Sequence, residues 1–430
     1  MLYSNKIYLK FITKDNNKHN KCNKIIAAFV YEFSTGHKYY VNFCHGDLLI
    51  DDTFENFKDE LETNPYKVYV TNKKDYKYWL DCDLIDVNLF GFIENNEVFE
   101  KKSYTCKNFI QIGIGNINDY NLIVPLVIHK REFDDEVDRI KSLGSKHTDS
   151  YCFKFFNDVL TDTLFEVEKN GLKVDIETFN NHFDGKVYNG YVYTNYYIYN
   201  PTGRPSNRFD RINYAALHKE GGSRSSFVSR FGSDGYLWMV DFTGFHPYIV
   251  SYLVDYKVPD NETIYEHLAK YYYDTDVISP ELLASAKKLT MFNLYGQINE
   301  SYLNIPYFVK AEEFKNKYWV QFINNGYVET PVYKRKITNK HIVDPNKNKL
   351  FAYIIQAAET EFAINSLNSC LKFISDKQII PILYMYDSIL FDVHNSVNKD
   401  VLEDLIDIIK NKMFKVKVYK GNNYNDLKLL

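Results

Sequence analysis

The sequence predicts an α/β protein with two domains, a smaller strand-rich domain followed by a larger mixed one. Three observations predict this class. The first hundred residues alternate β-rich runs with turn signals and one amphipathic helix. From about residue 131, helical periodicity alternates with short apolar strands. The length of 430 residues is also enough for two or three domains, each with its own core.

The first domain is predicted from its strand signals. Three β-rich runs are followed by a helix over 53–64, with Thr53 as its N-cap. A further strand is expected over 68–72, and 75–80 could open a second helix. The three β-rich runs are "KIYLKFI" (6–12), "IIAAFVYEF" (25–33) and "KYYVNF" (38–43). "STGH" between the last two is typical of a hairpin connection.

The second domain opens on helices. A helical pattern runs from about 131 to 170 and stops at Gly171, as helices commonly stop at glycine. An arginine-rich loop follows, and then an apolar strand, "GYLWMVDF". Further elements are expected as helices over 246–296, 350–374 and 397–412, a strand-turn segment over 381–394 and a strand over 413–419.

Composition bounds the class of protein. Hydrophobic residues make up 45% of the chain and charged residues 25%, which is typical of a soluble globular protein. No signal peptide is recognisable, and no apolar run reaches the roughly 18 residues of a membrane span. The six cysteines form no C-x-x-C pair, which argues against a zinc site or a disulfide scaffold. A reducing, cytoplasmic location is therefore expected.

Arginine is concentrated in one segment. The chain has eight arginines, and five of them lie within 27 residues: Arg204, Arg208, Arg211, Arg224 and Arg230. Planar guanidinium groups suit the recognition of phosphates and base edges, so the segment favours nucleic-acid binding. A solvated basic loop is the alternative, and the net charge of −4 does not by itself indicate a nucleic-acid binder.

Two aspartates lie in otherwise apolar segments. Asp387 interrupts "PILYMYDSILFDVH" (381–394), where Asp387-Ser388 is typical of a turn between two strands. Asp241 ends the strand "GYLWMVDF". Two such carboxylates held side by side repel each other unless a cation lies between them. Oxygen ligands without His or Cys suit Mg²⁺, and paired ions would catalyse displacement at phosphorus. The pattern alone is weak, because two strand aspartates can occur by chance.

A helix predicted over 281–297 carries a positive charge that could complement the two aspartates. Its Lys287, Met291 and Tyr295 are spaced at i, i+4 and i+8, so they share one face. A lysine, an apolar residue and an aromatic residue on one stripe could hold a triphosphate and a base. The alternative is an amphipathic core helix with a lysine that extends to solvent.

These segments, in this order, resemble the family A DNA polymerases of the bacterial polymerase I type. The resemblance covers most of the chain, and several motifs in register are more specific than any one. The matching segments are "VEKNGLKVD" (167–175), "NPTGRPSNRFDRIN" (200–213), "VDFTGFHPYIV" (240–250), "AKKLTMFNLYG" (286–296), "GYVETPVYKRK" (326–336), "QAAETEF" (356–362), "YMYDSILFDV" (384–393) and "VYKGNNYNDLK" (418–428).

The resemblance implies roles for individual residues. Asp241, Asp387 and the backbone carbonyl of Phe242 would hold two Mg²⁺ ions. Lys287 would bind the triphosphate of the incoming dNTP, and the nucleotide pocket would also include Met291, Tyr295 and His246. Arg204 would contact the minor groove near the primer end. The remaining predicted DNA-binding residues are Arg208, Arg211, Arg224, Asn213 and Gln356.

The resemblance also implies the architecture. Residues 150–430 would form a right-hand polymerase domain, and residues 1–135 an RNase H-like, 3′–5′ exonuclease-type domain. Within the polymerase domain the predicted parts are a reduced thumb at about 150–200, a palm at about 201–250 and 375–430, and fingers at about 251–374. Only about 28 residues separate Asp175 from Gly203, too few for the family's long helical thumb. Weak processivity, or a partner that replaces the thumb, is therefore expected.

Several positions depart from the family pattern. His246 stands where the family has the glutamate that closes off the ribose 2′ position, so sugar selectivity is open. Leu283 replaces an arginine for the triphosphate, Met291 replaces an aromatic residue and Ser388 replaces a glutamate. In the first domain the nuclease would need an Asp-x-Glu pair on its first strand, yet the first acid in the chain is Asp15. We therefore expect an inactive nuclease domain.

The leading hypothesis is a template-directed DNA polymerase whose partners are primer–template DNA and dNTPs, with no membrane. A single-subunit RNA polymerase-like enzyme is the first alternative, because the sugar gate is altered. A catalytically silent DNA-binding subunit is the second, because Leu283, Met291 and Ser388 depart from the family. Small size, divergence and a composition typical of an AT-rich genome suggest a bacteriophage-like origin, which would place the protein in the host cytoplasm.

Overall fold

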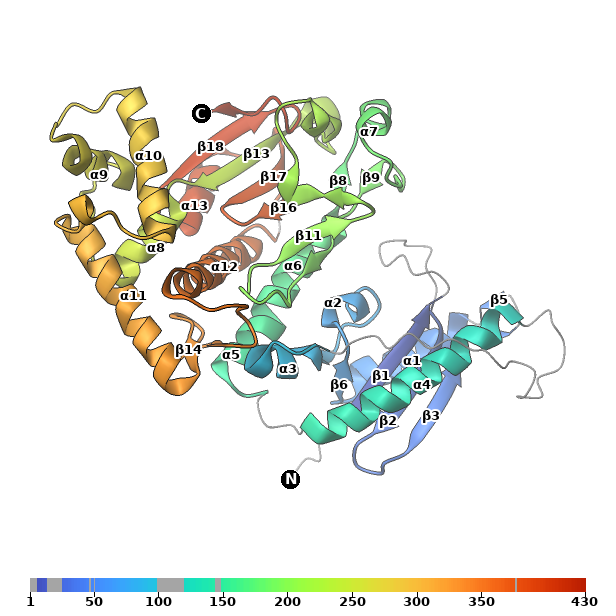
Figure 1. Cartoon of the computed structure of the whole chain (residues 1–430). Helices are drawn as coiled ribbons and strands as arrows, with labels where there is room; N and C mark the ends of the chain where they lie inside the picture. Colours follow the sequence, from blue (N-terminus) through green and yellow to red (C-terminus); the bar gives the residue numbers. More distant parts are fainter. Residues whose placement is uncertain are drawn as a thin grey trace. The chain divides into compact units, whose positions relative to one another are not determined.

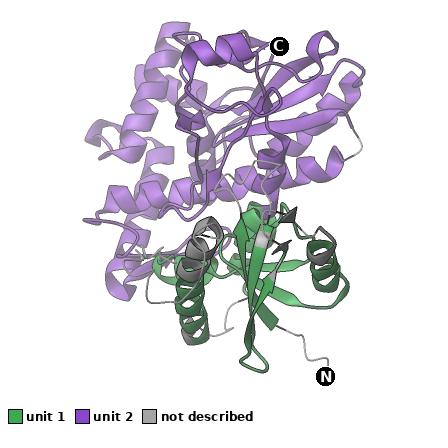
Figure 2. Cartoon of the chain, turned by 90° about the vertical axis from the view of Figure 1, so that its right-hand side faces the viewer, with its two compact units in different colours: residues 1–161 green, residues 162–430 purple. Residues whose placement is uncertain are grey.

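The computed structural model describes residues 6–13, 25–45, 48–49, 51–98, 120–143, 148–375 and 377–430. The chain forms two compact units, residues 1–161 and 162–430, which Figure 2 shows in different colours. Asp15, the first acidic residue in the sequence, lies outside the described residues. None of the described helices is long and apolar enough to cross a membrane.

The first unit is built on one five-stranded sheet. Its strands lie in the order β3-β2-β1-β6-β7. The pairs β1–β2 and β2–β3 are antiparallel, whereas β1–β6 and β6–β7 are parallel. The elements are β1 Lys6–Thr13, β2 Ile25–Glu32, β3 Lys38–Asn42, β4 Cys44–His45, β5 Leu48–Leu49, α1 Asp51–Thr63, β6 Lys67–Val70, α2 Lys73–Tyr76, β7 Asp83–Asp86, α3 Asn88–Asn95, α4 Tyr120–Leu143, α5 Tyr151–Lys154 and a π-helical turn, Phe155–Leu160.

A helix covers each face of this sheet. Successive side chains of β1 point to opposite sides, so the strand contacts both helices. Tyr8 stacks on Phe133 of α4, with 5.7 Å between ring centroids. Phe11 lies on the opposite face and meets Phe54 of α1 edge to face, with 6.1 Å between centroids. Apolar side chains therefore line both faces, as in other sheets covered on two sides.

The predicted start of α1 was wrong by two residues. The helix begins at Asp51, so Thr53 lies inside it and is not the N-cap. The other predicted strands and helices of this unit are present, with ends that differ by a few residues.

The second unit contains most of the described helices and a second sheet (Figure 1). Its strands are β8 Leu172–Lys173, β9 Tyr191–Val192, β10 Tyr196–Tyr197, β11 Ser206–Phe209, β12 Ile212–Asn213, β13 Gly235–Phe242, β14 Tyr327–Glu329, β15 Lys336–Thr338, β16 Ile379–Met385, β17 Ser388–His394, β18 Val416–Gly421 and β19 Lys428–Leu429. Its helices are α6 Thr161–Asn170, α7 Ile176–His182, α8 Phe245–Leu253, α9 Ile264–Tyr273, α10 Pro280–Tyr295, α11 Pro306–Asn325, α12 Lys347–Phe373 and α13 Lys399–Lys410.

The main sheet of this unit is antiparallel throughout, in the order β16-β17-β13-β18-β19. The central strand, β13, pairs with β17 on one side and β18 on the other. Leu237 on one of its faces belongs to a buried core with Leu383 and Leu390. Trp238 on the other face packs on Phe391, with 5.6 Å between ring centroids. Both faces of the sheet are thus largely apolar, and Asp241 and Asp392 are acidic exceptions on β13 and β17.

Helices pack beside this sheet. The 27-residue α12 packs against α8, α11 and α13, and α10 packs against α9 and α12. Figure 1 shows α9, α10 and α11 grouped together in yellow and orange, with α12 between them and the red strands. Between Asp175 and Gly203, all of which is described, the only helix is the seven-residue α7. No helical hairpin of the length expected of a full thumb is present in that segment.

Candidate active site

Asp241 is placed by the end of the central strand. It is the seventh residue of β13 and pairs with Ser388 of β17 and with Lys417 of β18. The strand pattern puts Asp241 on the same face as Leu237, where the sheet ends and the apolar core gives way to a cavity. The next turn leads directly into α8, so the residues that follow Asp241 also line this cavity.

Asp387 is placed by a tight turn. The turn between β16 and β17 consists of Tyr386 and Asp387, one residue earlier than expected, and Ser388 is already part of the strand. The backbone N–H of Phe242 donates to the carbonyl of Asp387 over 2.8 Å. This bond ties the end of β13 to the turn. The two aspartates, 146 positions apart in the sequence, therefore lie together, as expected from the sequence.

Tyr386 makes the turn possible at a conformational cost. Its φ of 61° is left-handed, which is uncommon for an aromatic residue. The guanidinium of Arg204 lies over its ring, 3.6 Å from the centroid. A cation held this close to an aromatic face is attracted by it, which favours the strained conformer.

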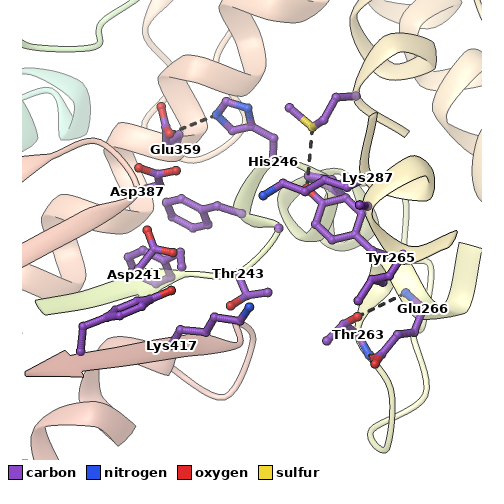
Figure 3. A pocket seen from close by; sticks show the side chains of 18 of the residues that line it. Asp241, Thr243, His246, Thr263, Tyr265, Glu266, Lys287, Glu359, Asp387 and Lys417 are labelled. Atoms are coloured by element: carbon purple, nitrogen blue, oxygen red, sulfur yellow. Dashed lines mark hydrogen bonds and ion pairs between the residues drawn. The ribbon is translucent and has the colours of Figure 1, made fainter. Parts of the chain in front are cut away.

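One cavity of about 640 Å³ collects the predicted chemistry. Asp241 and Asp387 line it from the sheet, Lys287 from α10 and His246 from α8. Figure 3 shows the two aspartates side by side and Lys287 extending from α10 toward their side of the cavity. The cavity has the size and mixed lining of a site for a small molecule or cofactor.

The two carboxylates share a poorly solvated, negatively charged environment. Burial, and then the nearby charge of Asp387, raise the pKa of Asp241 to about 6, although Lys287 and Lys417 partly oppose the shift. Burial, and then the charge of Glu359, also raise the pKa of Asp387. The two carboxylates are therefore poorly solvated and repel each other, and a cation bound between them would relieve that repulsion.

The residues present fit magnesium bound together with a substrate. Among the described residues, no three His, Cys, Asp or Glu side chains converge closely enough to hold a metal ion by themselves. Mg²⁺ usually takes only one or two carboxylates from the protein, and water and substrate phosphates complete its shell. Two repelling carboxylates that face an open cavity provide such a partial shell. Phe242 also lines the cavity, and the role of its carbonyl stays a prediction.

We expect Asp241→Asn to stabilise the metal-free protein. The folded-state pKa of about 6 lies above the ordinary value of 3.8, so folding stability falls as pH rises through this window. At pH 8 the variant should gain about 1–2 kcal/mol in its free energy of unfolding, measured by urea denaturation in EDTA. Mg²⁺ should stabilise the wild type more than the variant. Asp404→Asn, on exposed α13, is the control, and equal behaviour of the two variants would contradict the expectation.

The stripe predicted on α10 is confirmed at two of its three positions. Lys287 and Met291 line the cavity, together with Leu283 one turn earlier. The ammonium of Lys287 lies 5.9 Å from the ring centroid of Tyr265 of α9. The hydroxyl of Tyr265 donates to the sulfur of Met291 over 3.8 Å. The part of this face that carries Lys287 and Met291 therefore points into the cavity.

Tyr295 does not line the cavity, but it contacts His246, which does. Its hydroxyl forms a hydrogen bond with Nδ1 of His246, and burial raises the pKa of this tyrosine well above its ordinary value. Nε2 of His246 lies 3.1 Å from a carboxylate oxygen of Glu359 of α12. The imidazole is thus held at both nitrogens by residues from two other helices, as Figure 3 shows for Glu359.

The clustered arginines divide by environment. Arg204 lines the cavity and pairs with Glu359 through Nε at 2.8 Å and Nη2 at 3.1 Å. Arg230 pairs with the buried Asp392 and donates to the carbonyls of 170 and 171, so its role is structural. Arg224 donates to the carbonyl of Leu217 and lies over the ring of Tyr424.

The other predicted DNA-binding residues lie away from the cavity lining. Arg208 is exposed on β11, and Arg211 pairs with Asp184 on the surface. Asn213 on β12 and Gln356 on α12 are half-buried. None of these four lines the cavity, and their role in DNA binding stays a prediction.

Among the cavity residues that the sequence did not single out, three lie next to Asp241, Lys287 or His246. Glu359 lies inside the quoted segment 356–362 without an assigned role. Lys417 pairs with Asp241 across strands, a position that depends on the register of β18. Tyr265 is one of many tyrosines in the sequence. Only Glu359 carried a usable signal, because a carboxylate among apolar residues of a long helix requires a partner.

The fold is similar to that of a polymerase domain, as comparison with a solved structure shows. The POL domain of Pol1 from M. smegmatis, in complex with DNA primer-template and dNTP, matches with a TM-score of 0.68. The match covers 99% of this chain and 96% of that chain, at 12% sequence identity. Identity this low shows a shared fold alone, and it confirms the predicted polymerase-type α/β fold. No protein-family model and no curated protein matches the sequence.

Proposed function

We propose that the protein is a template-directed DNA polymerase that adds dNTPs to the 3′ end of a primer. The observation that carries this proposal is the convergence of Asp241, Asp387 and Lys287 on one cavity. The similar fold of a domain in complex with primer-template and dNTP supports it. The proposal includes membership of family A, of the polymerase I type. It also includes the division of the second unit into palm, fingers and a reduced thumb.

Each of the following cavity residues would have a separate role in the proposed reaction. Two Mg²⁺ ions bound by Asp241, Asp387 and the carbonyl of Phe242 would supply Lewis acidity to the primer hydroxyl and to the leaving pyrophosphate. Lys287 would donate to phosphate oxygens and stabilise negative charge that develops there. Met291 and Tyr265 would provide apolar surface for the base. Arg204 would bind near the primer end, where its planar donors suit phosphates and base edges.

Primer extension tests the proposal and separates it from its alternatives. A short primed template with Mg²⁺ is supplied with either dNTPs or rNTPs. Extension with dNTPs alone supports the DNA polymerase. Extension with rNTPs alone would favour the RNA polymerase-like alternative, for which the altered residue at 246 is the reason. DNA binding without extension of either kind would favour a silent DNA-binding subunit.

The short segment around α7 supports weak processivity. Duplex DNA would have no long helical hairpin to grip it between Asp175 and Gly203. We propose that a partner protein replaces this grip during replication, and that the isolated chain adds few nucleotides each time it binds DNA.

We further propose that the first unit is an exonuclease-type domain without nuclease activity. Three antiparallel strands extended by two parallel ones support the exonuclease-type layout. The described part of the first strand, Lys6–Thr13, contains no acid. Its buried Lys10 instead pairs with Glu132 and Glu136 of α4, at 3.0 and 2.8 Å. An ammonium group here neutralises the two carboxylates that could otherwise attract a metal ion.

We expect no degradation of DNA from its 3′ end. A single-stranded oligonucleotide labelled at its 5′ end, incubated with the protein and Mg²⁺ or Mn²⁺, should keep its full length because a two-metal nuclease site cannot assemble around Lys10. The products are resolved on a denaturing gel. Metal-dependent shortening that persists in the Asp387→Asn variant would overturn this part of the proposal, because it would place a nuclease outside the polymerase cavity.

A further inference from the structure

Glu359 is a buried carboxylate that connects three segments of the cavity wall. Its side chain, in the middle of α12, is only 1% exposed. Its carboxylate accepts a hydrogen bond from Nη2 of Arg204 over 3.1 Å. It also lies within ion-pair distance of two further nitrogens, Nε of Arg204 at 2.8 Å and Nε2 of His246 at 3.1 Å. A carboxylate this deeply buried is costly unless it is paired and hydrogen-bonded. The two partners therefore account for its burial, and it in turn restricts both of them.

The contact favours one tautomer of His246. Nε2 lies 3.1 Å from a carboxylate oxygen of Glu359 without hydrogen-bond geometry, and a carboxylate at this distance favours a hydrogen on the nitrogen that faces it. In the neutral ring, Nδ1 is then free to accept from the Tyr295 hydroxyl, which keeps its proton because burial raises its pKa. The chain Glu359–His246–Tyr295 thus joins α12, α8 and α10 through one imidazole. Both the tilt of the ring and its position in the cavity follow from this chain.

We propose that Glu359 is a positioning residue for sugar selection, an inference that rests on the polymerase function proposed above. A nucleotide whose phosphates lie between Lys287 and the two aspartates would place its sugar beside the wall that carries His246, since all four residues line one cavity. A ring that is hydrogen-bonded to Tyr295 at Nδ1 and faces the buried Glu359 carboxylate at Nε2 is a restricted wall that excludes an added 2′-hydroxyl. The same carboxylate holds Arg204 over Tyr386, next to Asp387. Selection of a deoxyribose therefore depends on a carboxylate of α12.

The test measures nucleotide binding without chemistry. The full-length protein is bound to a primer–template whose primer ends in a dideoxynucleotide, and the Kd values of the matching dNTP and rNTP are measured with Mg²⁺. The wild type should bind the dNTP more tightly. Glu359→Ala should lower the rNTP-to-dNTP Kd ratio by about fivefold or more, because the freed imidazole can rotate away from the sugar. Glu313→Gln, on the exposed side of α11, should leave the ratio unchanged.

A double-mutant cycle separates positioning from a general structural effect. If Glu359 acts through His246, the double variant of His246→Ala and Glu359→Ala should show the same ratio as His246→Ala alone. Additive losses, or an unchanged ratio in Glu359→Ala, would overturn the inference. Glu359→Leu fills the same space without accepting a hydrogen bond, so it carries the same expectation if the alanine variant does not fold. Failure of the wild-type complex to bind any nucleotide would instead refute the proposed polymerase function.

Discussion

Asp387→Asn is expected to lower primer extension with dNTPs by at least about 10³-fold. Asparagine keeps the size of the side chain, so the turn at Tyr386 and the bond from Phe242 to the backbone carbonyl should persist. What is lost is the negative charge of one of the two neighbouring aspartates that line the cavity. Metal-assisted stabilisation of a phosphoryl-transfer transition state is worth several kcal/mol, and each 1.36 kcal/mol is a factor of ten in rate.

The measurement is single-turnover extension of a labelled primer by one nucleotide, beside a DNA-binding titration. Asp404→Asn makes the same chemical change on exposed α13 and should extend at the wild-type rate. Binding of primer–template to Asp387→Asn should fall only slightly, because the aspartate acts on the reacting phosphate. Extension within about tenfold of the wild type would remove Asp387 from the proposed catalytic residues.

Local sequence patterns predicted the parts of this site that strands and helices place by themselves. The apolar run before Asp241 predicts a strand that ends at a carboxylate, and the apolar residues on both sides of Asp387 predict a turn between strands. The i, i+4 spacing of Lys287 and Met291 predicts a shared helix face. Each feature depends on residues a few positions apart, so periodicity was enough to find it.

Positions set by tertiary packing were not predictable in the same way. Lys417 faces Asp241 only because β18 pairs with β13 in one register, and that register depends on the whole sheet. Glu359 meets His246 only because α12 packs against α8. Tyr295 was expected in the nucleotide pocket, yet its hydroxyl is bonded to the histidine that lines it. The pairing of the two aspartates was a hypothesis based on their positions at the ends of strands, and the family resemblance added support to it.

The surroundings of two departures from the family pattern contain groups similar to the ones that are missing. The glutamate expected at position 246 is absent, but α12 provides a carboxylate that contacts the histidine in its place. The aromatic residue expected at Met291 is absent, but the ring of Tyr265 lies next to that methionine. In both cases the missing group is replaced by a residue from a neighbouring helix. This pattern favours a working site over a decayed one.

Lys287→Ala is expected to reduce kcat/KM for dNTP incorporation by between about 10²- and 10³-fold. Leu283 stands one turn before it where the family has an arginine, so Lys287 is the only cation that α10 contributes to the cavity lining. Removing one preorganised donor that stabilises developing charge costs this much in other enzymes. Lys288→Ala is a closely matched control. That residue is exposed on the same helix, but its position about 100° around the helix axis keeps it out of the cavity.

Steady-state incorporation of a single nucleotide by both variants distinguishes the two lysines. Loss in Lys287→Ala alone assigns the phosphate contact to the cavity face of α10, and a fall in kcat beyond a rise in KM would place that contact in the transition state. Equal losses in both variants would point to a general effect of positive charge on DNA binding. In that case DNA binding should weaken as the salt concentration rises, because contacts with the DNA backbone release counterions. A contact with the triphosphate inside the cavity should depend on salt much less, so the salt series separates the two explanations.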